Sequence, residues 1–228
     1  MRKTFDQELQ RLQDEVIVLG SMVEKALKDA VDALKRHDLE AAQRIIDGDH
    51  EVNAKRFAIE SDVLVLIATQ QPMARDLRTL AAVLEIITEL ERIGDYAKGI
   101  SKINLMIGHQ PFVKPLVDIP RMVDKATDML RRALDAFVRR DVELARAIPK
   151  EDDQVDALYN QVNRELLTYI LADPSTFEQA NLLQWAAHNL ERAADRVTNI
   201  CERVVFTVTG KMMELDTHFD GKDTQSTA

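Results

Sequence analysis

Cysteine, glycine, proline and aromatic residues are all scarce in this chain of 228 residues. The chain has 1 cysteine, 7 glycines, 6 prolines and 5% aromatic residues. A single cysteine excludes a disulfide within the chain and fits a reducing compartment such as the cytoplasm. β-Barrels and β-sandwiches need many turns and many aromatic strand residues, so this composition argues against both architectures.

Long apolar runs and an excess of positive charge are also missing. The longest stretches without a charged residue, 63–74 and 179–190, have 12 residues each, whereas a membrane-spanning helix needs about 18 to 20. We therefore expect no direct insertion into a membrane, and the charged N-terminal segment does not match a secretory signal. The net charge of -9 repels nucleic-acid phosphates, so we expect no nucleic-acid partner.

Helical periodicity is the feature that the chain has in abundance. From Leu9 onwards, apolar residues recur at steps of three and four, which predicts an amphipathic helix that ends near Arg36. A second helix follows a predicted N-cap at Asp38 and stops before Pro72, and a third is predicted over 74–105. Helices of about 30 residues are about 45 Å long, and such lengths indicate a helical bundle.

The second half of the chain repeats the first. Asp49 has its counterpart in Asp152, and LERIGDYAKGI at 90–100 matches LERAADRVTNI at 190–200. We therefore predict an all-α fold of two tandem three-helix bundles, with six long helices in total. The predicted boundaries are a first repeat at 1–107, a proline-rich linker at 108–120, a second repeat at 121–215 and a disordered tail at 216–228.

Two pairs of acidic residues interrupt an apolar helix face at the same place in both repeats. Glu91 and Asp95 are four residues apart, as are Glu191 and Asp195, so each pair lies on one face of its helix. Two carboxylates in such a place repel each other and need a partner. A nearby arginine or lysine is one explanation. A bound cation is the other, and it is favoured because Leu-Glu-Arg-x-x-Asp occurs in both repeats.

The preceding helix of each repeat supplies further oxygen donors. Asp49 with Asn53, and Asp152 with Asp156, have the same spacing of four. If the second and third helices of a unit are antiparallel neighbours, both sets converge on one cation. Carboxylate and amide oxygens suit Mg, Mn, Ca or ferric iron, whereas zinc usually brings His or Cys. His188 is either part of the second site or an ordinary helix-surface residue.

Other chemical signatures are absent from the sequence. It contains no phosphate-binding loop, dinucleotide-binding glycine motif or nucleophile elbow. It also lacks the Glu-x-x-His of ferritin-like di-iron proteins. Cys201, Trp185 and the eight methionines are predicted to pack between helices. Arg75 and Arg78 fit either a partner contact or an ion network in the first turn of the third helix.

Four segments together carry a resemblance to a known family. They are GDHEVN at 48–53, QPMARDLR at 71–78, ELERIGDYA at 89–97 and NLERAADRVTNICE at 189–202. The chain resembles the PhoU family, the accessory regulators of bacterial phosphate transport, over nearly its whole length. The resemblance implies a pair of three-helix bundles whose acidic motifs bind metal clusters, with iron in some members and other divalent ions in others. Together with the oxygen donors described above, it leads us to expect iron, manganese or magnesium rather than zinc. The metal ligands that it implies are Glu91, Asp95, Glu191 and Asp195, followed by Asp49, Asp152, Asp156 and Asn53.

The same resemblance implies a regulatory function. The protein is expected to be a cytoplasmic negative regulator of the phosphate (Pho) regulon and a modulator of phosphate uptake, without enzymatic activity. The implied partners are the ATPase subunit of the phosphate ABC transporter, the sensor histidine kinase and a second copy in a homodimer. Two other classes stay open: a carboxylate-bridged metalloenzyme or metal-storage bundle, and a helical scaffold without metal.

Overall fold

The structure is a computed structural model that describes residues 2–215, and this part of the chain contains helices and connections but no strand. The tail predicted to be disordered, 216–228, lies outside it. No helix within 2–215 has an apolar stretch long enough to span a bilayer. In chain order the elements are α1 (Arg2–Arg36), α2 (Leu39–Gln70), α3 (Ala74–Ile107), α4 (Asp118–Arg139), α5 (Val142–Ala147), η1 (Ile148–Glu151), α6 (Asp152–Ala172), η2 (Pro174–Thr176) and α7 (Phe177–Thr209).

The six predicted helical segments are present in the described part of the chain, but the fifth is divided into three pieces. The helix α5, the 3-10 helix η1 and the helix α6 follow one another without a loop. Pro149 lies in η1. Proline has no backbone N–H, and its ring clashes with the preceding turn, so a regular α-helix is interrupted there. The equivalent helix of the first repeat, α2, contains no proline and runs unbroken for 32 residues.

Both repeats use the same arrangement to begin their second helical segment. His37 and Arg140, which follow α1 and α4, take left-handed φ angles of 52° and 57°. The next residues, Asp38 and Asp141, each accept a hydrogen bond from the backbone N–H three positions on, at 2.8 and 2.9 Å. Such side-chain caps satisfy N–H groups that have no partner within the helix. The predicted N-cap at Asp38 is confirmed.

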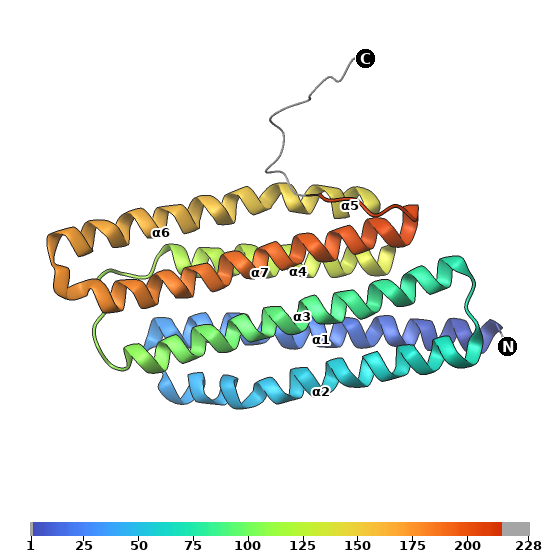
Figure 1. Cartoon of the computed structure of the whole chain (residues 1–228). Helices are drawn as coiled ribbons and strands as arrows, with labels where there is room; N and C mark the ends of the chain where they lie inside the picture. The colour runs from blue at the N-terminus through green and yellow to red at the C-terminus, as the bar shows by residue number, and fades with distance from the viewer. Residues whose placement is uncertain (1, 216–228) are drawn as a thin grey trace, which may run out of the picture.

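The two repeats lie side by side with their long axes aligned (Figure 1). Helices α1, α2 and α3 form one unit, and α4 to α7 form the other. Because α3 packs along α7 and α1 packs along α4, these four helices occupy the centre, while α2 and α6 lie on opposite outer sides (Figure 1). The connection between the units runs over 108–117, and α4 begins three residues before the predicted repeat start at 121.

Polar side chains set the register of α3 against α7. Asn199 donates a hydrogen bond to Glu89 at 3.2 Å, and Arg196 lies 3.5 Å from the same carboxylate. Further along the contact, a Cβ added to Gly99 would lie 3.0 Å from Oδ1 of Asn189. Glu89 and Asn189 hold equivalent positions of the two repeats, as do Gly99 and Asn199. The helices therefore cross antiparallel about an approximate two-fold axis.

Of the residues predicted to pack between helices, some are buried and others are exposed. Cys201 is fully buried, as predicted, and burial raises the pKa of its thiol to about 12. The prediction for Trp185 is wrong: this side chain of α7 is 53% exposed. The methionines differ among themselves, since Met122 is buried and Met106 is 67% exposed.

Candidate metal-binding sites

In the first repeat, the two predicted sets of oxygen donors lie together. The turn at 71–73 reverses the chain, so α2 and α3 run antiparallel, and Asp49 of α2 comes within electrostatic range of Glu91 and Asp95 of α3. Asp49 is only 8% exposed. Its Oδ2 accepts hydrogen bonds from Nζ of Lys98 at 2.6 Å and from Nδ2 of Asn53 at 3.1 Å.

The partly buried position of the α3 acids disfavours their charged forms. Burial and the neighbouring Asp95 raise the pKa of Glu91, although Arg56 acts in the opposite direction. Burial and Asp49 likewise raise the pKa of Asp95, against the lowering effect of Lys98. Burial is the largest cause of both shifts, and a cation bound beside these acids would favour their charged forms.

The second repeat carries the matching acids with different counter-charges. Asp152 begins α6 and is 8% exposed, as is its counterpart in α2. Glu191 lies 3.2 Å from Nδ1 of His188, and Asp195 lies 2.7 Å from Nη1 of Arg192. His188 is thus placed directly beside the acidic pair. Its ring also lies edge-on to the Trp185 ring, with centroids 5.6 Å apart.

The carboxylate and amide oxygens of the predicted ligands suit a hard cation. In this structure, however, basic side chains lie beside them. Within residues 2–215, no three His, Cys, Asp or Glu side chains are arranged to hold a metal ion. Lys98 and Arg192 instead pair with one acid in each repeat. Asp156, one turn after Asp152 on α6, is half-buried. Metal binding would require these side chains to reorient, and it stays a prediction.

A further polar cluster at the contact of the repeats was not anticipated from the sequence. Nε of Arg196 donates a long hydrogen bond of 3.4 Å to the Tyr96 hydroxyl. Burial opposes the charge on Arg196, but this hydrogen bond and the negative charge of Glu89 raise the pKa of its guanidinium. Tyr96 and Arg196 occupy equivalent positions of the two repeats. The two repeats thus carry different polar residues at this position. That difference is the only feature of the sequence that points to this contact.

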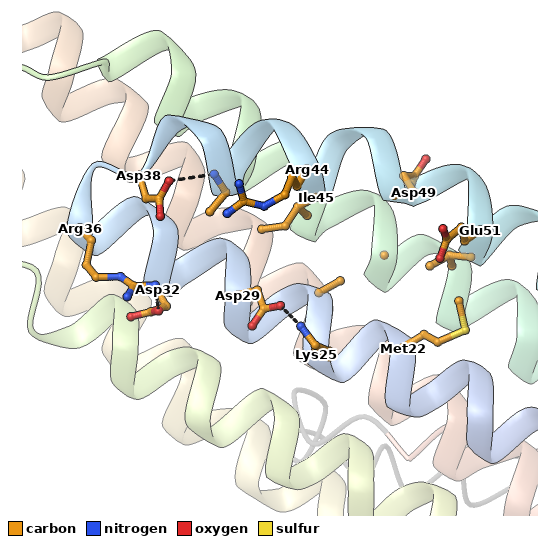
Figure 2. A pocket seen from close by; sticks show the side chains of 15 residues that line it. Met22, Lys25, Asp29, Asp32, Arg36, Asp38, Arg44, Ile45, Asp49 and Glu51 are labelled. Atoms are coloured by element: carbon orange, nitrogen blue, oxygen red, sulfur yellow. Dashed lines mark hydrogen bonds and ion pairs between the residues drawn. The ribbon is translucent and has the colours of Figure 1, made fainter.

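A cavity of about 600 Å³ opens between α1 and α2 beside the first acidic site. Asp49 lies at one end of it, and the ion pair of Lys25 and Asp29 lines its α1 wall (Figure 2). Ile45 of α2 also lines it and is half-buried. The counterpart of that residue, Ile148, is fully buried in η1. At this position the second repeat therefore buries an isoleucine that α2 leaves half-buried.

The fold and the acidic pairs define a class of protein: a duplicated three-helix bundle with one Glu/Asp pair on the third helix of each repeat. A family model described as the PhoU domain matches residues 16–103 and 119–204, so each match lies within one of the two units. The chain belongs to the PhoU family.

Comparison with individual proteins agrees over nearly the full length. The chain is 36% identical to a phosphate-specific transport system accessory protein PhoU homolog of Clostridium acetobutylicum, over 94% of this chain and 99% of that protein. It is also 36% identical to the Escherichia coli accessory protein PhoU, over 96% and 93% of the two chains. The crystal structure of PhoU from Pseudomonas aeruginosa superposes with a TM-score of 0.85 at 32% identity, covering 91% of this chain and 100% of that one.

Proposed function

We propose that this chain is a non-enzymatic accessory protein of phosphate-specific transport, which acts in the cytoplasm as a negative regulator of the phosphate-starvation response. The observation that carries the proposal is the 36% identity to proteins named as accessory proteins of that system, over almost the whole chain. Its partners are the ATPase subunit of the phosphate transporter and the sensor histidine kinase, and it forms a homodimer. The long helices supply broad faces for such contacts.

Deletion and binding experiments test this role. Removing the gene should switch on a phosphate-starvation reporter in cells grown with ample phosphate, and the intact gene should restore repression. Purified protein should also bind the ATPase subunit or the kinase in a pull-down with defined components. A reporter that stays repressed in the deletion strain, together with no association at high or low phosphate, would contradict the proposal.

We further propose that the acidic pairs hold metal ions, with iron, manganese or magnesium better suited than zinc to these oxygen donors. The raised pKa values of Glu91 and Asp95 and the duplication of the motif support this. A bound cation would neutralise the acids, fix neighbouring helices and offer a coordination position to an anion such as phosphate. The proposed ligands are Asp49, Asn53, Glu91 and Asp95 in the first repeat, and Asp152, Asp156, Glu191 and Asp195 in the second.

Elemental analysis of protein purified without a chelator tests the metal proposal. The variant Glu91→Gln with Asp95→Asn should lose about half of the metal while its circular dichroism stays unchanged. The control Glu85→Gln alters an exposed acid of α3 that pairs with Arg203, and it should keep the full metal content. Unchanged metal in a variant that removes both acidic pairs would rule out these ligands.

A further inference from the structure

The outer face of α2 carries a stripe of apolar side chains that is exposed to solvent. Residues three, four and seven positions apart share one face of a helix. The α2 stripe consists of five apolar residues and one serine, all of them exposed: Ala54, Phe57, Ser61, Leu64, Val65 and Ala68. Phe57, Leu64 and Val65 are 59%, 54% and 58% exposed. The stripe extends for about 21 Å along the helix. None of its own residues is charged, but the guanidinium of Arg56 lies over the Phe57 ring, 4.8 Å from the centroid.

The second repeat shows that the fold does not require an apolar stripe at this place. Helices α2 and α6 hold equivalent outer positions (Figure 1). Six residues of α6, 103 positions further along the chain, are also exposed: Ala157, Asn160, Arg164, Leu167, Thr168 and Leu171. Three of these are polar, including a charged arginine at the centre of the series. A contiguous exposed apolar face of this kind is typical of a binding surface.

The border of the stripe on the side of α1 is acidic. Arg11 of α1 is shared by Asp62 of α2 and Glu8 of α1, at 2.9 Å in each case, and Lys55 pairs with Glu15. Together with Glu51, which is exposed, these residues give the border four carboxylates and two basic groups. This border attracts a basic partner. It disfavours a second copy of a chain whose net charge is -9, because a two-fold contact brings like surfaces together.

We propose that the α2 stripe docks an amphipathic helix of another protein, whose apolar face is bordered by lysine or arginine. Packing of the two helices buries Phe57, Leu64 and Val65, and the basic border of the partner pairs with the carboxylates along α1. The homodimer then forms through a different face. Docking at the α2 stripe requires neither a bound metal nor the partners named under the proposed function. The docking proposal and the proposed function can therefore be tested separately, and either can fail without the other.

Two designed peptides test this proposal on the full chain. Both are helices of about 18 residues with the same leucine face, one bordered by lysine and the other by glutamate. Fluorescence anisotropy should show that the lysine peptide binds about ten-fold more tightly than the glutamate peptide. Its affinity should also fall as NaCl rises from about 50 to about 300 mM, because salt screens the border charges.

Matched double variants locate the binding face. Phe57→Gln with Leu64→Gln on α2 should weaken binding of the lysine peptide about ten-fold, whereas Leu167→Gln with Leu171→Gln on α6 should change it less than about two-fold. These four side chains are all more than half exposed, so both variants should keep the circular dichroism of the wild type.

Several results would overturn the proposal. If the lysine and glutamate peptides bind with equal affinity, the acidic border does not select a basic partner. If the two double variants weaken binding equally, the peptide does not bind at the α2 stripe. If sedimentation shows a wild-type dimer that only the α2 variant converts to monomer, a second copy covers the stripe. If vesicles of phosphatidylglycerol and phosphatidylethanolamine bind the wild type but not the α2 variant, a membrane surface covers it.

Discussion

At the scale of single residues, Glu91 and Asp95 are held where folding disfavours their charged forms. Burial and neighbouring carboxylates raise both pKa values above those of the unfolded chain. The native state therefore keeps its protons to higher pH than the unfolded state does. Stability declines as pH rises from the ordinary carboxyl values through the raised ones, and the full penalty applies above them. A bound cation would remove this penalty.

Neutralising this pair should stabilise the metal-free protein. At pH 7, Glu91→Gln with Asp95→Asn should raise the free energy of unfolding in urea by about 0.2–0.5 kcal/mol, because two like charges four residues apart no longer repel. The decline of stability with rising pH should also become shallower. Lower stability of this variant in the absence of metal would contradict the expectation.

An acid with the opposite shift provides the control. Hydrogen bonds from Lys114 and Gln161 lower the pKa of Glu165, so its contribution to stability is present at neutral pH and is lost as pH falls through the lowered value. Glu165→Gln should therefore reduce stability at pH 7, by less than about 1 kcal/mol because this carboxylate is partly exposed.

Cys201 should be chemically inert in the folded protein. Its thiol is fully buried, and burial raises its pKa to about 12, so almost no thiolate is present near pH 8. Ellman's reagent should react with the native protein only as fast as the chain unfolds, and rapidly in denaturant. Fast reaction under native conditions would show that α7 opens at this position.

At the scale of elements, glycines decide how closely particular helices approach. A Cβ on Gly20 of α1 would overlap Cδ1 of Leu134 on α4. Leu134 is only 5% exposed, so its side chain has little room to move. Gly48 of α2 lies beside the cavity, and a Cβ there would meet nothing within 4 Å.

These two glycines should respond to alanine in opposite directions. Gly20→Ala should lower the free energy of unfolding by about 1–3 kcal/mol, because it overpacks the contact of α1 with α4. Gly48→Ala should raise it by up to about 1 kcal/mol, because alanine favours the helix and has space. Chemical denaturation of both variants measures the difference. Equal stabilisation by the two substitutions would show that α1 and α4 do not pack closely at Gly20.

At the scale of the whole molecule, the contact between α3 and α7 joins the two repeats into one structure. Glu89 and Arg196 form its central charged pair, and their side chains are 13% and 15% exposed. Glu85 and Arg203 form a second pair across the same contact at 3.0 Å, but Glu85 is 48% exposed. The two pairs therefore differ mainly in their access to water.

This difference predicts unequal effects on stability. Glu89→Ala should lower the free energy of unfolding by about 1–3 kcal/mol, because it leaves Arg196 buried with fewer partners. Glu85→Ala should lower it by less than about 1 kcal/mol. Fluorescence of Trp185, the single tryptophan, reports on the second repeat, and circular dichroism reports on all helices. The two wild-type transitions should coincide, and separate transitions would show that the repeats unfold independently.

Local patterns in the sequence were sufficient to predict the helices, but not to predict which groups lie beside the acidic side chains. The step of three and four residues and the cap at Asp38 depend on neighbours within one or two turns, so they were predicted correctly. The pairing of Asp49 with Lys98 joins residues 49 positions apart on two helices. The choice between a cation and a basic side chain therefore could not be made from spacing alone.

The sequence by itself determined the all-α class, the duplication and the family, because periodicity and repeated motifs are properties of the linear order. Only the tertiary structure decided that Trp185 lies at the surface, that Pro149 divides one helix of the second repeat, and that α2 is left with an uncovered apolar face. These outcomes depend on which helix faces are covered by neighbours, and that is set by packing between residues far apart in the chain.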